Sequence, residues 1–296
     1  MLGNGFDLYH GLPTRFEDFR VYVLMRKPQL VEVAEKYLCN LQGNWSNLEE
    51  AFANFDEDTV VDEASYFLKS YGADDWSDSF HHDYQLEISR IVEPLSSELK
   101  EHFYAWLCDI DMSAMDESLK LRIVNPSLFL NFNYTPVLQD FYAIPDDQIL
   151  HIHGSINNGG EEEIILGHGW NPQSRIESQE NHASDDHDVR TIEGQDIIKN
   201  YFQATFKPTD SLLIKHNDFM ERLAEITNIY VWGHSLSSVD IPYFEAVIDA
   251  TRVGKPHWHI SYFSQGEKLH HQSVMDNLGV SKHEVTFLQL TRSEAQ

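Results

Sequence analysis

Two histidines with one residue between them, His151 and His153, lie in the segment HIHGS. In a strand, alternate residues point to the same face, so the two imidazoles would lie side by side. Histidine suits general acid or base catalysis near neutral pH, and Gly154 lets a ligand approach the backbone. The competing interpretation is two histidines hydrogen-bonded within the protein. His168, in LGHGW, is the candidate third ligand for a metal, but we expect no metal here.

The segment GNGFD, beginning at Gly3, is a glycine turn placed ahead of a helix. Glycines in such a turn let the backbone approach a pyrophosphate, and free amides there attract anions. Only Met1 and Leu2 precede the turn, whereas a turn of this type normally follows a buried strand of about five residues. Either the first strand is vestigial or the chain begins downstream of its natural start, and both interpretations stay open.

Polar side chains follow two further strand-like segments. In NFNYT, Asn133 comes directly after LFL, where α/β folds place ligands; the alternative is that Asn133 caps the next helix. In GHSL, Gly233 and Ser235 end the segment NIYVW, and Asp240 follows shortly after; here the alternative is a plain turn with Ser235 as a helix cap. Four strand ends presenting Gly, Asn, His or Ser predict one shared crevice.

The elements that would position these residues alternate between helix and strand, which predicts an α/β fold. We expect a single domain over residues 1–296, with a Rossmann-like, mostly parallel sheet of about six strands and a large helical insertion. Short apolar runs bounded by Gly, Asn or Pro mark the expected strands. These runs are residues 128–132, 148–152, 163–166, 228–232, 258–263 and 285–290.

Two sequence patterns predict where helices begin. Thr14 with Glu17, and Ser46 with Glu49, have the spacing of capping boxes. Trp45, just before the second of these, is expected to pack in the interior.

Residues 28–120 are expected to be almost wholly helical and to form the insertion, with a kink or a break at Pro94. The acidic stretch 171–193 is expected to be an exposed loop. Residues 194–226 are expected to be helical.

The charge balance of the chain bears on its partners. Lys and Arg number 21 against 48 Asp and Glu, a net charge of −27. Nucleic-acid binding without sequence preference depends on basic side chains, so we expect no direct nucleic-acid binding. The acidic surface favours a basic partner. The run Asp185, Asp186, His187 and Asp188 is interpreted as a solvated patch and not as the metal cluster of a nuclease.

No apolar run reaches the roughly 18–20 residues of a membrane helix, and no secretory signal is apparent. We therefore expect a cytoplasmic protein that does not enter a membrane. The two cysteines, Cys39 and Cys108, are interpreted as buried thiols, although they are numerous enough for one disulfide.

Several motifs, in order, resemble the AbiH family of bacterial phage abortive-infection proteins. They are GNGFDL, NWSNLEE, LNFNYT, LHIHGS, LGHG and VWGHSLSSVDIPYF. The opening GNGFDLYHGLPTRFEDF is the most specific stretch, and the resemblance runs along nearly the whole chain. It implies a defence protein that acts by abortive infection.

The same motifs are more distantly similar to those of sirtuin-like NAD-binding domains. The matching positions are the loop glycines Gly3 and Gly5, the motif asparagine Asn133, the catalytic histidine His153 before Gly154, and the last turn at Gly233, Ser235 and Leu236. In defence proteins this resemblance implies cleavage of NAD. It does not imply deacetylation, because two cysteines cannot build the four-cysteine zinc module of the deacetylases.

The chain departs from the sirtuin pattern at three positions. Asn4 replaces a small loop residue, Thr135 stands where an aspartate is usual, and His234 replaces a threonine. The missing aspartate would have stabilised the cation that develops on the ribose, so Asp7 or Asp240 would have to supply that charge.

The resemblance implies the following roles. Gly3, Gly5 and Ser235 would contact phosphates, Asn133 would orient the ribose or the attacking water, and His153 would be the base, with His151 as its neighbour or substitute. The full set expected to contact NAD, as substrate or ligand, is Gly3, Asn4, Gly5, Asp7, Thr135, Gly233, His234, Ser235 and Asp240. The alternative is a sensor or scaffold that binds a nucleotide, a defence-system protein or a second copy of itself without chemistry.

Overall fold

The computed structural model describes residues 1–74, 76–123, 127–157, 159–172 and 188–290. The chain divides into two compact units, each built from separated stretches of sequence. Unit 1 comprises Met1–Arg15, Trp106–Ile165 and Pro208–Gln296. Unit 2 comprises Phe16–Ala105 and Leu166–Lys207. All the residues expected to contact a nucleotide belong to unit 1.

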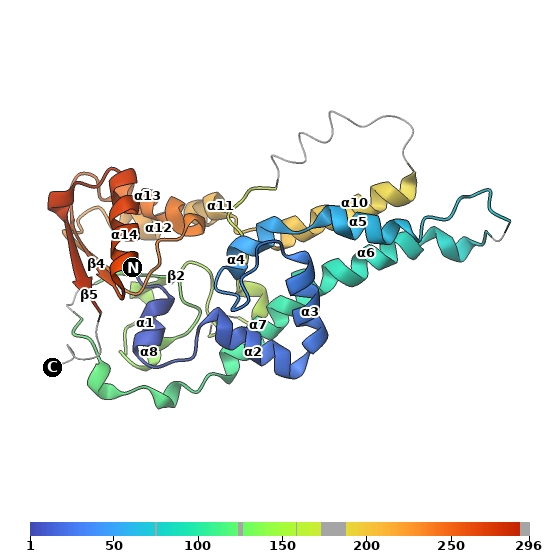
Figure 1. Ribbon diagram of the computed structural model, residues 1–296. Coiled ribbons are helices and arrows are strands. Elements are labelled where there is room, and N and C mark those ends of the chain that lie inside the picture. The colour runs from blue at the N-terminus through green and yellow to red at the C-terminus, as the bar shows by residue number, and fades with distance from the viewer. Residues whose placement is uncertain (75, 124–126, 158, 173–187, 291–296) are drawn as a thin grey trace. The chain divides into compact units, whose positions relative to one another are not determined.

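Unit 1 contains two small sheets, both parallel throughout (Figure 1). The first pairs β1 (Phe129–Asn131) with β2 (Ile149–His151), and the second has the order β3 (Asn228–Val231), β4 (His257–Tyr262), β5 (Val285–Gln289). The fold is therefore mixed α/β and mostly helical. Five of the six predicted strands are confirmed. The sixth, at 163–166, is wrong, because this stretch begins at the end of a 3-10 turn, η7 (Glu161–Glu163), and is followed by irregular chain.

Leu2 lies between the two sheets of unit 1. It forms isolated parallel bridges to Asn131 at the end of β1 and to Trp232 just after β3. The Leu2 amide donates to the Leu130 carbonyl at 3.0 Å, and the Trp232 amide donates to the Met1 carbonyl at 3.0 Å. A single residue thus occupies the position of a strand between β1 and β3.

The core of unit 1 is formed by strand residues and by the helices beside them. Leu130, Ile152, Val231, Phe244 and Ile260 belong to one buried apolar cluster. The helices of unit 1 are α1 (Asn4–Tyr9), α8 (Val137–Asp140), α11 (Thr209–Lys215), α12 (Asn217–Glu221), α13 (Ile241–Ala250) and α14 (Gln265–Asn277). Its short 3-10 turns besides η7 are η4 (Met112–Ala114), η5 (Glu117–Leu119), η6 (Asp146–Gln148), η8 (Ser238–Asp240) and η9 (Lys282–Glu284).

Helices make up most of unit 2, but residues 28–120 are less completely helical than predicted, since 39–47 and 66–74 are turns and irregular chain. The helices are α2 (Phe16–Arg26), α3 (Pro28–Tyr37), α4 (Leu48–Ala51), α5 (Glu57–Ser65), α6 (Asp83–Glu93), α7 (Leu99–Asp109), whose end lies in unit 1, and α10 (Val189–Ala204), with the 3-10 turns η1 (Phe52–Asn54) and η2 (Asp78–His81). The break predicted at Pro94 is confirmed, because Pro94 begins a π-helical turn, η3 (Pro94–Glu98), between α6 and α7.

Neither predicted capping box is present. The Thr14 hydroxyl has no hydrogen-bond partner among the described residues. Helix α4 begins one residue later than predicted, with Asn47 at its N-cap, and the Ser46 hydroxyl donates to Gln42 instead. Trp45 is fully buried, as predicted. Its burial next to Leu48 gives a physical reason for the shifted helix start.

The interpretation of the cysteines as buried thiols is wrong, since Cys39 and Cys108 are both exposed and both free. Most of the predicted acidic loop, residues 173–187, lies outside the described residues. Its end is helical instead, because Asp188 accepts a hydrogen bond from the Arg190 amide and caps α10. Of the acidic run at 185–188, only Asp188 is described.

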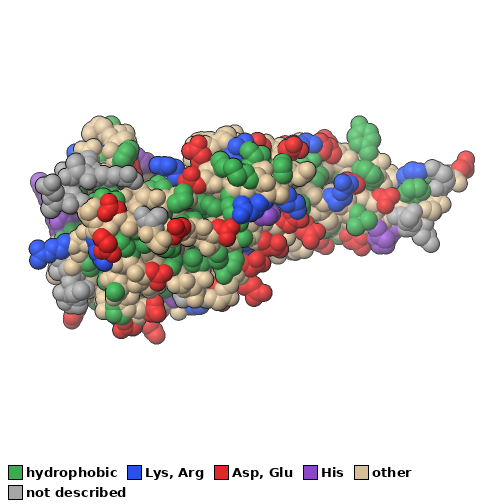
Figure 2. Space-filling model, turned by 90° about the horizontal axis from the view of Figure 1, so that it is seen from below, with side chains coloured by type: hydrophobic (Ala, Val, Ile, Leu, Met, Phe, Trp, Pro, Cys, Tyr) green, Lys and Arg blue, Asp and Glu red, His purple; other side chains and the backbone are tan. Residues whose placement is uncertain are grey.

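Acidic side chains are spread over the face seen in Figure 2 and do not gather in one patch. Among the described residues, no helix has both the length and the apolar character needed to cross a bilayer.

Candidate active site

The glycine turn at the amino terminus packs against the turn that follows β3. The Gly5 amide donates to the Gly233 carbonyl at 2.7 Å, and the Gly3 amide donates to the Trp232 carbonyl at 3.0 Å. A Cβ added at Gly5 would lie 2.7 Å from the Gly233 Cα, and Gly233 has a φ of +63°. These glycines therefore allow two backbones to touch, and the amides of Gly3 and Gly5 are used within the protein.

A buried carboxylate, Asp7 on α1, binds the polar residues that follow β1. Its Oδ1 accepts a hydrogen bond from the Asn133 amide nitrogen at 2.8 Å, and its Oδ2 accepts one from the Thr135 hydroxyl at 2.5 Å. Burial raises the pKa of Asp7 to about 7, although the bonds from Thr135 and Asn133 lower it. Asp7 is thus poised between its charged and neutral forms near neutral pH.

Asn133 is fixed on two sides. Its backbone amide donates a hydrogen bond to the Asn131 side-chain Oδ1 at 3.1 Å. Its side-chain nitrogen also donates to the Gly3 carbonyl at 3.1 Å. The alternative role of Asn133 as a helix cap is wrong, because α8 begins at Val137 with Pro136 at its N-cap.

The two histidines of HIHGS contact different partners. His151 ends β2, and its Nδ1 donates to the Asn133 carbonyl at 2.8 Å, which leaves Nε2 to accept from Gln139 at 3.1 Å. Burial lowers the pKa of His151, and the bond to Asn133 offsets this only in part. His151 is therefore held as a neutral ring that supports Asn133.

His153 lies instead with Asp240 and His234 in a second buried cluster. Its Nε2 is 3.8 Å from Asp240 Oδ1, and His234 Nε2 is 3.4 Å from Asp240 Oδ2. The rings of Phe132 and Tyr243 pack edge-on against His153, with ring centroids 5.6 and 5.4 Å away. The carboxylate of Asp240 therefore lies between two imidazoles in an aromatic environment.

Gly3 joins the two clusters. Its carbonyl accepts from Asn133, which binds Asp7. On its other side, a Cβ added at Gly3 would lie 2.6 Å from the His234 Cα. The structure thus brings together residues from all four predicted segments.

Two predicted residues lie apart from the buried clusters. Asn4 is exposed, and its side-chain amide donates to the Thr14 carbonyl at 2.7 Å. Ser235 is exposed at the tip of the turn after β3. An exposed hydroxyl at that position remains accessible to a ligand.

Sequence reasoning missed residues on β4 and α14 that support the turn after β3. The Ser261 hydroxyl accepts a hydrogen bond from the Gly233 amide at 2.8 Å. His271 is fully buried, and His234 is among the groups that affect its pKa, which burial lowers. Ser261 lies within the β4 strand itself, and His271 offers only a helical i,i+4 spacing to Glu267, so neither carries a motif that would have identified it.

A cavity of about 490 Å³ runs beside β1 and β3, lined from Leu128 and Asn228 at their amino ends to Leu2 and Trp232 near their carboxyl ends, and by none of the polar residues of the two buried clusters. It is distinct from the buried clusters, which lie at the carboxyl ends of the strands. No group of three or more His, Cys, Asp or Glu side chains in the described part of the chain is arranged to hold a metal.

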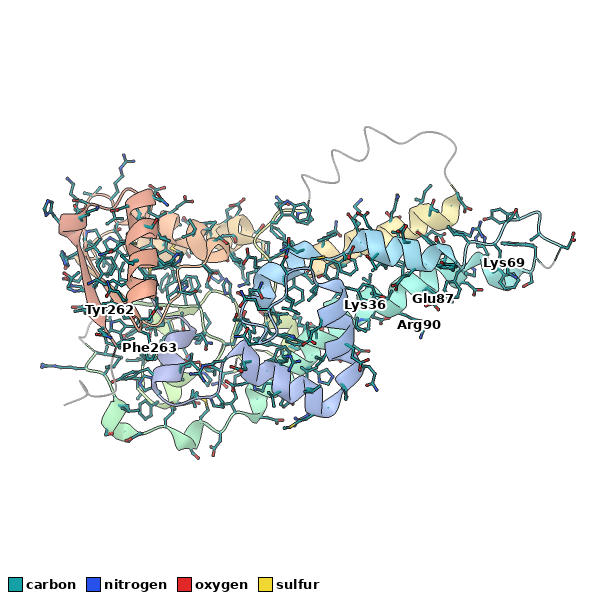
Figure 3. The ribbon with its side chains drawn as sticks, viewed as in Figure 1. Lys36, Lys69, Glu87, Arg90, Tyr262 and Phe263 are labelled. Atoms are coloured by element: carbon teal, nitrogen blue, oxygen red, sulfur yellow. The ribbon has the colours of Figure 1, made fainter. Side chains whose placement is uncertain are left out.

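Unit 2 has its own groove of about 420 Å³ between α3, α5 and α6. Lys36, Glu87 and Arg90 line it and are labelled in Figure 3. Both cations form ion pairs, Lys36 with Glu63 and Arg90 with Glu87, each at 2.8 Å. Glu32 also lines the groove, so the two cations face three carboxylates and the groove offers no excess positive charge to an anionic ligand.

Comparison with models of known protein families identifies a family for this chain. The model described as bacteriophage abortive infection AbiH matches residues 1–262, a range that contains every residue of the two clusters. Neither the curated proteins nor the solved structures contain a match. None of these comparisons supports the sirtuin likeness.

Proposed function

Because the chain belongs to the AbiH family of bacteriophage abortive-infection proteins, we propose that its unit 1 binds NAD or a related dinucleotide and hydrolyses the bond between nicotinamide and ribose. Family membership makes the chain an anti-phage defence protein. The dinucleotide chemistry is the further step, and it depends on the position and the character of the two buried clusters.

The order of the strands supports a dinucleotide site at this position. If Leu2 counts as a first, one-residue strand, the bridges place the strands in the order β2, β1, Leu2, β3, β4, β5. In chain order this is 3-2-1-4-5-6, the order of dinucleotide-binding Rossmann folds, which bind ligands where the order reverses. That point lies between Leu2 and β3, where Gly3 meets Gly233.

The charges of the site suit cleavage of a nicotinamide–ribose bond. As the bond to nicotinamide breaks, positive charge develops on the ribose, and a nearby carboxylate stabilises it. The sirtuin-like pattern has an aspartate where this chain has Thr135, but the carboxylate of Asp7 lies 2.5 Å from the Thr135 hydroxyl. Asp7 would therefore restore the charge from a different element.

His153 would act as the base. It would remove a proton from water as the water oxygen bonds to the ribose carbon and nicotinamide leaves with the electrons of the broken bond. Asn133, fixed by Asp7 and the Gly3 carbonyl, would orient the ribose or that water. Ser235 would contact a phosphate at the exposed turn.

The observation that carries the proposal is the convergence at Gly3. Asn133 with Asp7 lies on one side of this residue and His234 with Asp240 and His153 on the other, so all the proposed groups border the point at which the strand order reverses.

The test is nicotinamide release from NAD by the purified chain, followed by chromatography with and without phage lysate. We expect His153→Ala to lower the rate at least about 100-fold, since a general base typically contributes that much. His283→Ala, an exposed histidine of the same unit, is the control and should keep the wild-type rate. Equal rates for wild type and His153→Ala would refute the assignment.

A second candidate function, a sensor or scaffold without chemistry, is favoured by one observation. The amides of Gly3 and Gly5 already donate to Trp232 and Gly233, so they are not available to a pyrophosphate as they stand. Titration calorimetry with NAD and with ADP-ribose separates the two functions. Binding without nicotinamide release would favour the sensor, and no binding of either compound would exclude both.

A further inference from the structure

We propose that Asp240 and His234 are positioning residues that act through His153, with the Asp240 carboxylate holding the His153 ring in one orientation and one tautomer. This rests on the proposed function only in making His153 the base. It replaces the role suggested by the sequence, in which both residues contact the nucleotide.

The backbone fixes the tautomer of His234. The Leu236 amide donates to His234 Nδ1 at 2.9 Å, so this nitrogen must be an acceptor without a proton. The proton of the neutral ring is then on Nε2, which is 3.4 Å from Asp240 Oδ2. Leu236 itself has a φ of +53°, an unusual conformation for a non-glycine residue that the turn imposes.

The Asp240 carboxylate is held on the same side by a short turn. The Ser237 hydroxyl donates to Oδ2 at 3.2 Å, and the Asp240 amide donates to the Ser237 carbonyl at 3.1 Å. With Oδ2 directed to His234 and Ser237, Oδ1 is the oxygen that faces His153, at 3.8 Å from its Nε2.

The arrangement has the form of a base oriented by a carboxylate, in which the carboxylate selects the tautomer and stabilises the charged ring. The separation of 3.8 Å is longer than a hydrogen bond, and such contacts often shorten when the substrate binds. The surroundings are largely apolar, because Phe132 packs against both imidazoles. The Asp240 charge therefore acts on His153 with little screening.

The titratable groups around the cluster come from three elements besides β2 and the β3 turn. They are Tyr243 on α13, Tyr134 after β1, and His271 on α14, whose charge interacts with that of His234. Asp240 is the carboxylate directly opposite the His153 ring, so its removal should dominate the response of that ring.

The test is a nuclear magnetic resonance titration of the His153 ring nitrogens in wild type and in Asp240→Asn, with the signals assigned by their loss in His153→Gln. We expect His153 to carry its proton on Nε2 in the wild type, and to become a mixture of tautomers in Asp240→Asn. Its titration midpoint should move to lower pH by about one unit, because a nearby negative charge is lost. Asp249→Asn, an exposed carboxylate on α13, is the matched control and should change neither.

A second variant, His234→Gln, keeps a side-chain amide that can donate to Asp240. We expect it to retain the His153 tautomer, which separates orientation by the carboxylate from a general loosening of the turn. If circular dichroism shows that Asp240→Asn is folded, and the tautomer and titration midpoint of His153 are unchanged in it, the proposal is overturned. If Asp240→Asn is unfolded, the same measurements on Asp240→Glu decide, since a longer carboxylate should retain the midpoint and alter the tautomer ratio.

The readout is independent of catalysis. A chain that releases no nicotinamide but shows the His153 response would contradict the proposed function and leave the positioning by Asp240 intact. Nicotinamide release that depends on His153 but is unchanged in Asp240→Asn would support the proposed function and contradict the positioning by Asp240.

Discussion

Asp7 shows how one residue couples the interior to the site. Its side chain is buried, and its two oxygens accept hydrogen bonds from Asn133 and Thr135. Because burial raises its pKa to about 7, the folded protein binds a proton that the unfolded chain, with an ordinary aspartate, releases near pH 4. Between these values the folded state is progressively disfavoured as the pH rises.

This linkage predicts the effect of Asp7→Asn, which cannot titrate. The free energy of unfolding of the wild type, measured relative to Asp7→Asn, should fall by about 2 kcal/mol between pH 5 and pH 7. Urea denaturation at several pH values measures this difference. A difference that is constant with pH would show that Asp7 titrates as an ordinary carboxyl.

The different surroundings of His151 and His153 could not be predicted from their local spacing. His151 and His153 share the same local pattern, and only partners distant in the chain distinguish them. The ring of His151 binds the Asn133 carbonyl and Gln139, whereas the ring of His153 faces Asp240, 87 positions later in the numbering. The local motif predicted that the segments lie together, and contacts between residues distant in the sequence give the two rings their different partners.

At the scale of elements, the turns around Gly3 and Gly233 carry the geometry of the site. Gly233 combines a positive φ with close backbone contact, because an added Cβ would lie 2.0 Å from the Phe6 nitrogen. Gly279 also has a positive φ, of +76°, but no atom lies within 4 Å of an added Cβ. Substitution of Gly279 by alanine therefore tests the effect of the positive φ alone on the free energy of unfolding, and substitution of Gly233 tests that effect together with the loss of the close backbone contact.

We expect Gly279→Ala to lower the free energy of unfolding by about 1 kcal/mol, the usual cost of a left-handed residue with a Cβ. Gly233→Ala should lower it by at least about 2 kcal/mol, because the amino-terminal turn must also move away. Thermal or urea unfolding of both variants measures this. Equal losses would indicate that the Gly3 and Gly233 turns are not in close contact in solution.

The elements themselves were predictable where apolar pattern and tertiary contacts agree. The strands β1 to β5 are short apolar runs that also find partners. The run at 163–166 has the same pattern, yet Ile164 is buried without belonging to a strand, and the Ile165 amide donates to the His153 carbonyl instead. Likewise, the capping pattern at Ser46 was overruled by the burial of Trp45, which local spacing does not encode.

For the whole molecule, buried histidines should control the response to acid. Burial lowers the pKa of His10, His151 and His271 in unit 1, and it lowers that of His168 in unit 2 to about 4. Each is neutral when folded but binds a proton below about pH 6.5 when unfolded. The stability that these rings confer is therefore lost as the pH falls below about 6.5, which is opposite in direction to the contribution of Asp7.

In an Asp7→Asn background, which removes the opposing contribution of Asp7, we expect the urea midpoint to be lower at pH 5.5 than at pH 7.5. His168→Gln should remove about 1 kcal/mol of this difference, since each such ring contributes about that much over the interval. His283→Gln, at an exposed position, should leave the difference unchanged. An unaltered difference in His168→Gln would mean that this ring is charged in the folded protein.

The position of Leu2 between β1 and β3 has a consequence for the newborn chain. Its partner on the β3 side, Trp232, lies 230 positions later in the chain. Asp240 is translated later still. The residues proposed to act on the dinucleotide therefore cannot meet until the chain has been made as far as Asp240, so a fragment that ends before β3 would carry the earlier motifs without the assembled site.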